Sequence, residues 1–298
     1  SEHMKLKLLK GFAKNYLKIP TPLVLCHQIT LRCNLRCSFC PFWRRAQDRE
    51  ELSTQEIKSA ISQAAELGVA IYNVWGGEPL LRSDIKECLA HAKEEGLATY
   101  VITNGILKEK IEEIAPYLDY LSVSIDGMRE TYEKLRKGDY FEKAVKGVEV
   151  SKRHGIKTAV NCVVCEQNLD ELEKLAALAE SLNVGISFEP VHEFEDVPRK
   201  IRNSFTYLKM IKNLKPNFRC SVHKLMLHLD ACGSVTTCFN SLGKIKEKQL
   251  KELWFSEKAQ EARKKMKRCE GCLFSGYAES SLLYSLNLEA IKNAISIL

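Results

Sequence analysis

The chain has 298 residues, of which 45% are hydrophobic and 28% are charged. This composition supports a buried core and excludes a disordered or fibrous chain. No run of about 18 apolar residues is present, so no membrane-spanning helix is expected. The net charge of +7 is small for this length, and nucleic acid is therefore not expected as a partner. Residues 1–4 resemble a cloning remnant, and because no secretory hydrophobic region follows them we expect a cytoplasmic protein.

The first predicted element is a basic amphipathic helix over residues 4–19. Its apolar residues fall on one side, and four lysines (Lys7, Lys10, Lys14 and Lys18) lie elsewhere. Such a helix either packs against the body of the protein, which we favour, or lies on an anionic membrane surface. The second alternative would make the protein peripheral at a membrane and would suit a lipid substrate.

Short apolar runs alternate with helical patterns from residue 23 to about residue 215. Ser53 is predicted to cap the first of these helices, with Glu56 at the capping-box distance and Gly68 at its end. The alternation predicts an α/β fold in which six parallel strands form a partial (β/α)6 TIM-type barrel. The expected strands are 23–29, 70–75, 98–103, 120–125, 157–164 and 184–189, and the expected helices are 54–67, 84–95, 108–118, 141–154 and 169–182.

The remainder of the chain has a different character. Five of the twelve cysteines lie between residues 218 and 274, and two short strands at 225–229 and 234–237 flank a turn at Gly233. A basic helix is expected over 253–267 and an amphipathic helix over 280–298. We therefore divide the chain into an N-terminal helix (1–22), a barrel (23–217) and a small C-terminal β-hairpin/α domain with the terminal helix (218–298). In a reducing cytosol, clustered cysteines indicate metal ligands rather than disulfides.

The first cysteine group follows the first strand directly, at the end where barrel enzymes place their chemistry. Cys33, Cys37 and Cys40 are separated by three and two residues. One loop can thus wrap three thiolates around an iron–sulfur cube and leave the fourth iron without a protein ligand. A zinc site would need a fourth ligand, and none lies nearby in the sequence.

This CxxxCxxC motif, with Phe39 before its last cysteine, resembles the radical S-adenosylmethionine superfamily. The resemblance implies that the open iron of a [4Fe–4S] cluster is chelated by the methionine end of S-adenosylmethionine. It further implies that reductive cleavage yields a 5′-deoxyadenosyl radical, with the electron coming from a donor such as flavodoxin or ferredoxin. Phe39 would then lie against the adenine.

Two loops after the second and third strands extend the resemblance. Gly76, Gly77 and Glu78 match the family motif that receives the methionine ammonium group. Glycines let backbone carbonyls approach a small cation, and Glu78 adds negative charge. Thr103 ends the third strand and matches a family motif near the cofactor and substrate.

Polar residues alternate along three later strands. Ser122, Ser124 and Asp126 share one face of the fourth strand, with apolar residues on the other. The polar face is expected to point into the barrel, where buried polar groups need partners. By resemblance Ser124 contacts the cofactor, whereas Asp126 either does so or braces the following turn. Asn161 and Glu189 are further lumen candidates on the next two strands, and Asn161 is expected to help seat the cofactor.

The second cysteine group consists of Cys220, Cys238, Cys269 and Cys272. A hairpin with ligands at its two ends, met by a Cys-x-x-Cys turn, can supply four thiolates to one site. The pattern resembles the Twitch domain, a truncated form of the SPASM extension of radical enzymes, and this implies an auxiliary [4Fe–4S] cluster. Cys232 is a spare thiol that could substitute as a ligand. The spacing alone leaves open a zinc site built from the same four residues.

These features together predict a radical S-adenosylmethionine enzyme with two [4Fe–4S] clusters, the second in electron transfer. The expected reaction is an oxidation or another radical modification of a small molecule or lipid. A peptide or cofactor-precursor maturase is the alternative, although the roughly 22 residues before the first strand leave little room for a peptide-recognition domain. A non-catalytic metal-binding scaffold is the remaining possibility.

Overall fold

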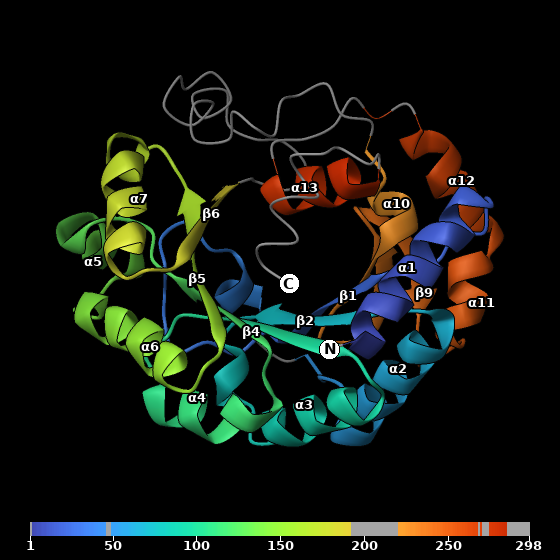
Figure 1. Ribbon diagram of the computed structural model, residues 1–298, viewed down its shortest axis with the longest axis horizontal. Helices are drawn as coiled ribbons and strands as arrows, with labels where there is room; N and C mark the ends of the chain where they lie inside the picture. The colour runs from blue at the N-terminus through green and yellow to red at the C-terminus, as the bar shows by residue number, and fades with distance from the viewer. Residues whose placement is uncertain (1, 46–48, 192–219, 268, 270–273, 285–298) are drawn as a thin grey trace.

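A curved nine-stranded sheet with helices on its outer side forms the frame of the protein (Figure 1). The computed structural model describes residues 2–45, 49–191, 220–267, 269 and 274–284. The strand order is β6-β5-β4-β3-β2-β1-β7-β8-β9, in which β1 to β7 run parallel and β8 and β9 run antiparallel. The strands are β1 (Val24–Thr30), β2 (Ile71–Gly76), β3 (Ala98–Thr103), β4 (Tyr120–Ser124), β5 (Lys157–Val164), β6 (Gly185–Pro190), β7 (Met226–Leu229), β8 (Ser234–Thr237) and β9 (Asn240–Lys244).

Most of the helices cover the convex side of the sheet, and the main core lies between these two layers. One fully buried aliphatic side chain on each strand from β1 to β5 points into this core: Leu25, Val74, Val101, Val123 and Val160. The helices are α1 (Glu2–Tyr16), α2 (Thr54–Leu67), α3 (Ile85–Glu94), α4 (Lys108–Ile114), α5 (Arg129–Arg136), α6 (Phe141–Arg153), α7 (Leu172–Ser181), α10 (Val222–Leu225), α11 (Leu250–Phe255), α12 (Glu257–Met266) and α13 (Ser275–Tyr284).

The predicted partial barrel is confirmed, and its six strands begin and end within one residue of the expected positions. The capping box is also confirmed, since the Ser53 hydroxyl accepts from the Glu56 amide and the Glu56 carboxylate accepts from the Ser53 amide. Gly68 ends α2 with φ of 108°, a left-handed conformation that favours glycine. These elements depend on interactions between residues a few positions apart, so the sequence pattern was sufficient to predict them.

Three expectations were wrong or incomplete. The helix predicted over residues 253–267 is broken at Ser256, which ends α11 in an extended conformation and caps α12 through its hydroxyl. Strand β9 and helix α5 were not predicted. The terminal helix begins at Ser275 instead of residue 280, and residues 285–298 lie outside the described residues.

The C-terminal region is joined to the barrel by strand pairing. β7 lies parallel to β1 in register from Val24 and Met226 onward, so the sheet continues past the boundary expected at residue 217, which lies outside the described residues. Helix α13 then crosses from β6 to the hairpin (Figure 1): the Gly276 amide donates to Glu189 at 3.0 Å, and the Ser281 hydroxyl accepts from the Ser221 amide at 2.9 Å.

Helix α1 packs against the barrel with one side, as favoured above. Phe12 and Tyr16 stack on Tyr284 of α13, with ring centroids 6.3 and 5.1 Å apart. The other side leaves Leu9 and Leu17 exposed, at 67% and 73% of their surface. No helix within the described ranges is both long and apolar enough to cross a membrane.

Candidate active site

The loop that follows β1 carries the first three cysteines and places them close to one another. Cys37 is buried, and the pKa of its thiol is raised to about 11: burial raises it most, the Arg136 guanidinium lowers it, and Asp126 and the neighbouring Cys40 and Cys33 thiols also raise it. At neutral pH such a thiol stays protonated unless a metal centre stabilises the thiolate. The loop therefore offers three thiols whose ionisation depends on what they bind.

The donor set suits an iron–sulfur cube better than a single ion. Among the residues described, no three His, Cys, Asp or Glu side chains are drawn together tightly enough to hold one metal ion. A cube accepts a wider set, because each thiolate binds a different iron at a different corner. Cys33, Cys37 and Cys40 would hold three irons and leave one open.

Helix α5 contacts the cysteine loop through its last turn. The Ser38 amide donates to the Leu135 carbonyl at 2.8 Å. Arg136 donates through Nε to the Asp126 carboxylate at 2.6 Å, forms an ion pair with the same oxygen at 2.5 Å, and its guanidinium lies 5.9 Å from the centre of the Phe39 ring. Arg136 thus places a buried positive charge beside the loop that must carry thiolates. No sequence pattern pointed to Arg136; the signal that could have found it was a buried Asp126 in need of a cation.

The Gly76–Gly77 turn is fastened to the chain just before the first cysteine. The Gly77 amide donates to the Thr30 carbonyl and the Glu78 amide to the Arg32 carbonyl, both at 2.8 Å. A Cβ on Gly77 would lie 2.1 Å from the Arg32 carbonyl oxygen, so no larger residue fits. Glycine is required here because two backbone segments touch.

Glu78 links this turn to the next loop. Its carboxylate is fully buried and accepts from the Leu80 amide at 3.0 Å, the Thr103 hydroxyl at 2.7 Å and the Asn104 amide at 2.8 Å. Burial raises the pKa of the Glu78 carboxyl, and these donors lower it. The Asn104 side chain in turn donates to Asn34 in the cysteine loop at 2.8 Å. Three loops predicted independently are therefore one hydrogen-bonded unit.

The predicted lumen residues fall on neighbouring strands in register. Ser124, Asn161 and Ser187 are paired across β4, β5 and β6, and the Ser187 hydroxyl donates to Asn161 at 2.9 Å. Ser124 is 9% exposed, and within the described part of the chain its hydroxyl has no hydrogen-bond partner. Ser122 lies deeper and shares a hydrogen bond of 2.5 Å with Tyr100. Ser124 and Asn161 are thus the pair placed nearest the carboxyl edge of the sheet.

Asp126 and Glu189 serve as braces in this structure. Asp126 is fully buried, with one oxygen held by Arg136 and the other accepting from the Val163 amide at 2.8 Å. Glu189 accepts the Gly276 amide and so anchors α13. For Asp126 this arrangement corresponds to the bracing alternative considered above; a cofactor contact by either carboxylate stays a prediction.

The second cysteine group lies beside the amino end of β1, away from the first. Cys220 is buried against Cys269, and Cys238 belongs to the same apolar cluster as Cys220. Cys272 lies outside the described residues. Cys232 occupies the turn at the other end of β8 from Cys238, near the carboxyl edge of the sheet. The structure therefore separates the spare thiol from Cys220, Cys238 and Cys269, the three predicted ligands that it describes.

Replacing Gly77 by alanine is expected to weaken S-adenosylmethionine binding roughly tenfold or more, because the added Cβ would push the turn away from the cysteine loop. Isothermal titration of the anaerobically reconstituted protein would measure this. Gly155→Ala is a suitable control: it strains a left-handed residue (φ 71°) that has open space around it. We expect it to cost about 1 kcal/mol of stability and to leave the affinity unchanged. Equal affinities for the two variants would contradict this role of Gly77.

Comparison with known protein families agrees with this arrangement. The model of the radical SAM superfamily matches residues 28–179, and that of an iron-sulfur cluster-binding domain, SPASM, matches residues 220–273. The chain belongs to the radical SAM superfamily and carries a SPASM-type C-terminal domain. A [4Fe–4S] cluster and S-adenosylmethionine are accordingly its cofactors, together with an additional iron–sulfur centre. The matches do not distinguish the Twitch subtype.

Individual relatives are similar over the barrel. The chain is 35% identical to the Fe-coproporphyrin III synthase of Methanosarcina barkeri over 58% of its own length and 45% of that protein. It is 34% identical to the mycofactocin maturase MftC of Mycolicibacterium smegmatis, over 54% and 42% of the two chains. It thus spans less than half the length of these relatives. The structure of Streptococcus suis SuiB bound to its precursor peptide SuiA matches 90% of this chain and 76% of that one, with a TM-score of 0.71 at 18% identity, and supports the fold.

Proposed function

We propose that this protein reductively cleaves S-adenosylmethionine and abstracts a hydrogen atom from a small-molecule cofactor precursor. One observation carries the proposal: the cysteine loop, the Gly76–Gly77 turn and the loop after Thr103 are hydrogen-bonded into a single unit at the carboxyl edge of the sheet. Cys33, Cys37 and Cys40 would hold a cluster there, and this cluster, when bound, would supply the electron for reductive cleavage of S-adenosylmethionine.

The chain's own residues bind and orient the reactants. Cys33, Cys37 and Cys40 hold three irons, and the backbone around Gly76 and Gly77 accepts the methionine ammonium. Ser124, whose hydroxyl has no partner in the described part of the chain, is available to the cofactor, with Asn161 beside it. Rigid support matters here because a positioning error of about 1 Å can reduce a rate a hundredfold.

The second cluster is proposed to transfer electrons. Four protein thiolates, from Cys220, Cys238, Cys269 and Cys272, would occupy all four irons and leave none for substrate. A fully ligated cluster can accept an electron from a substrate radical, which favours oxidation. An external donor such as flavodoxin or ferredoxin would reduce the first cluster.

The choice of a cofactor precursor rests on the relatives. The two relatives described above are, by name, a synthase of Fe-coproporphyrin III and a maturase of mycofactocin, although the chain spans under half of each. This favours the maturase alternative of the sequence analysis over a lipid as substrate. A peptide-derived precursor falls within the same class.

The test is anaerobic incubation of the reconstituted protein with dithionite and S-adenosylmethionine, followed by mass spectrometry for 5′-deoxyadenosine. We expect its formation above that of a protein-free control. If protein with its full iron content forms no 5′-deoxyadenosine, the enzyme proposal is wrong and the non-catalytic metal-binding scaffold is the hypothesis that remains.

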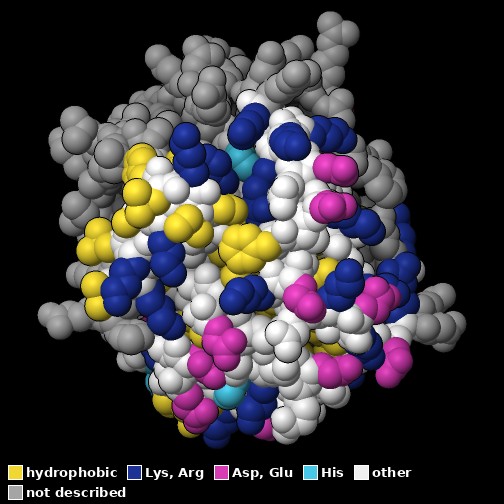
Figure 2. Space-filling model, turned by 90° about the vertical axis from the view of Figure 1, so that its right-hand side faces the viewer, with side chains coloured by type: hydrophobic (Ala, Val, Ile, Leu, Met, Phe, Trp, Pro, Cys, Tyr) yellow, Lys and Arg dark blue, Asp and Glu magenta, His cyan; other side chains and the backbone are white. Residues whose placement is uncertain are grey.

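A second proposal concerns the exposed side of α1. Leu9 and Leu17 are exposed close to Lys10, Lys14 and Lys18, and the surface on this side of the molecule shows hydrophobic side chains bordered by Lys and Arg (Figure 2). An apolar strip with basic neighbours has the chemistry of a peripheral contact with an anionic membrane.

We expect co-sedimentation with vesicles containing phosphatidylglycerol and little with pure phosphatidylcholine. The double substitution Leu9→Glu and Leu17→Glu should reduce this partitioning roughly tenfold or more, because each buried leucine contributes about 1.5–3 kcal/mol. Phe255→Glu, a comparable change at another exposed hydrophobic residue, should have a small effect. Binding that does not depend on lipid charge or on the two leucines would exclude the membrane contact.

A further inference from the structure

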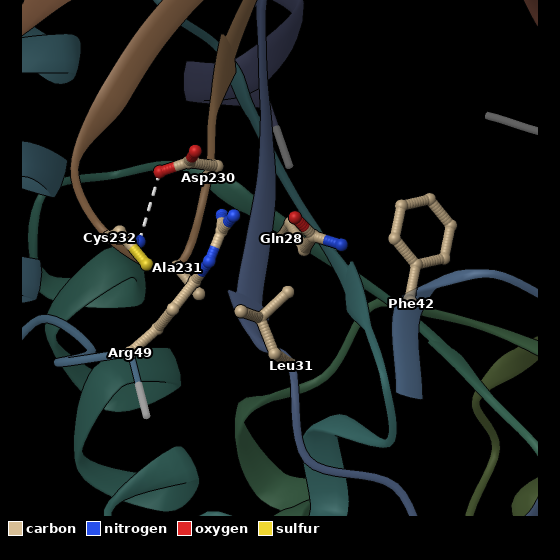
Figure 3. Close-up of a pocket in the computed structure, with 7 residues that line it drawn as sticks. All are labelled: Gln28, Leu31, Phe42, Arg49, Asp230, Ala231 and Cys232. Carbon is tan, nitrogen blue, oxygen red and sulfur yellow. Dashed lines mark hydrogen bonds between the residues drawn. The ribbon is translucent and has the colours of Figure 1, made fainter. Parts of the chain in front are cut away.

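A small pocket lies at the carboxyl ends of β1 and β7, between the cysteine loop and the hairpin turn (Figure 3). Its volume is about 90 Å³, and the residues that give it chemical character are Gln28, Phe42, Arg49, Asp230 and Cys232. None of them belongs to the predicted cofactor or cluster sites, apart from the spare thiol. The pocket exists because β7 pairs with β1 and brings the hairpin turn to the catalytic edge.

Gln28 indicates that the pocket is built for a polar ligand. Its side chain points from β1 into the pocket and is only 7% exposed. Its amide nitrogen is buried, and among the residues described it has no hydrogen-bond partner. A buried unsatisfied donor costs about 1–3 kcal/mol, and such groups in native structures call for an explanation. A ligand oxygen in the pocket would satisfy this donor.

Arg49 adds a positive charge to the same space. Its guanidinium reaches the Cys232 thiol, and within the described part of the chain it forms no ion pair with a carboxylate. Asp230 lines the same pocket; its Oδ1 accepts from the Cys232 amide at 2.9 Å (Figure 3) and from the Ser234 amide at 2.7 Å, and these bonds close the turn. The pocket is therefore lined by two donors of different type, the neutral Gln28 amide and the charged Arg49 guanidinium.

The size of the pocket limits what this acceptor can be. A volume of about 90 Å³ corresponds to roughly three water molecules at ~30 Å³ each, enough for a carboxylate and the carbon atom that carries it. Charge-assisted hydrogen bonds from guanidinium favour a carboxylate over a neutral amide. Phe42, which contacts Trp75 at the end of β2 with ring centroids 5.4 Å apart, supplies an apolar wall on the side of the cysteine loop.

We propose that this pocket binds a carboxylate group of the substrate through the Gln28 amide and the Arg49 guanidinium. The inference rests on the proposed function in that it assigns a substrate class, carboxylate-bearing precursors, to the same catalytic edge. A substrate anchored here would extend over the cysteine loop, since Phe42 follows Cys40 by two residues.

The test uses propionate as the probe and propionamide as its neutral counterpart, with the reconstituted protein under anaerobic conditions. Saturation-transfer NMR titrations give the dissociation constants. We expect propionate to bind more tightly than propionamide. Arg49→Gln should raise the propionate constant about tenfold or more and Gln28→Leu several-fold, because each removes a donor.

Matched controls distinguish propionate binding in this pocket from nonspecific attraction to surface charge. Arg153→Gln and Gln55→Leu remove an arginine and a glutamine that are exposed elsewhere, and both should leave propionate binding unchanged. Arg49 is exposed, so Arg49→Gln is expected to fold. If Gln28→Leu does not fold, the result for Arg49→Gln decides the test. Equal binding of the two probes, or an unchanged propionate constant in Arg49→Gln, would overturn the proposal.

The failure of this inference can be distinguished from that of the proposed function. The titration needs no turnover, whereas the proposed function is tested by 5′-deoxyadenosine formation in the wild-type protein. Wild-type protein that forms 5′-deoxyadenosine but binds both probes equally would contradict only the carboxylate pocket.

Discussion

The triple substitution Cys33→Ala, Cys37→Ala and Cys40→Ala is expected to abolish 5′-deoxyadenosine formation and to leave about four of about eight irons in the reconstituted protein. The three thiols lie on one loop, and no other described cysteine lies beside them to replace a lost ligand. The second group lies at the opposite end of β1 and should retain its own irons.

Iron and zinc analysis after anaerobic reconstitution measures this outcome directly. Cys88→Ala is the matched control, since this buried thiol belongs to neither cysteine group, and its variant should keep the full iron content. Retention of about four irons with little zinc would establish an auxiliary cluster in the C-terminal domain. Loss of all iron, or zinc in its place, would make that domain a structural clamp and remove its proposed electron-transfer role.

Arg136→Met is expected to destabilise the protein by about 3–5 kcal/mol, because it leaves the Asp126 carboxylate buried without its counter-charge. Both groups are inside the protein: Arg136 is 7% exposed and Asp126 is 0% exposed. The substitution also removes a positive charge beside Cys33 and Cys37, so we expect the variant to take up less iron at the first site. Chemical denaturation of the metal-free protein and iron analysis would test the two effects separately.

Arg129 provides the control on the same helix. It is about half exposed and pairs with surface carboxylates, so Arg129→Met should cost about 1 kcal/mol or less. Combining Arg136→Met with Asp126→Asn should recover part of the lost stability, because the unpaired charge is gone. Similar losses for the Arg136 and Arg129 variants would show that the buried pair does not stabilise the fold.

Local sequence signals were sufficient for the barrel. The capping box of Ser53 and Glu56, the glycine that ends α2 and the alternating strands depend on neighbours within a few residues, and the structure confirms them. The cysteine spacing likewise reflects one short loop around one cluster. The helix predicted over residues 253–267 was wrong at Ser256. Hydrophobic and basic residues continue at helical spacing on both sides of Ser256, so the periodic pattern does not reveal that this residue ends α11 and caps α12.

The class of protein follows from residue patterns: the alternation of strands and helices, the two cysteine groups and the cofactor chemistry that the first group implies. How these parts meet depends on the tertiary structure. Glu78 joins two loops 25 residues apart, Arg136 of an unpredicted helix neutralises Asp126, and β7 brings the hairpin turn to the catalytic edge. Such contacts join residues distant in the chain, and their partners are chosen by packing and charge in space, which no local pattern encodes.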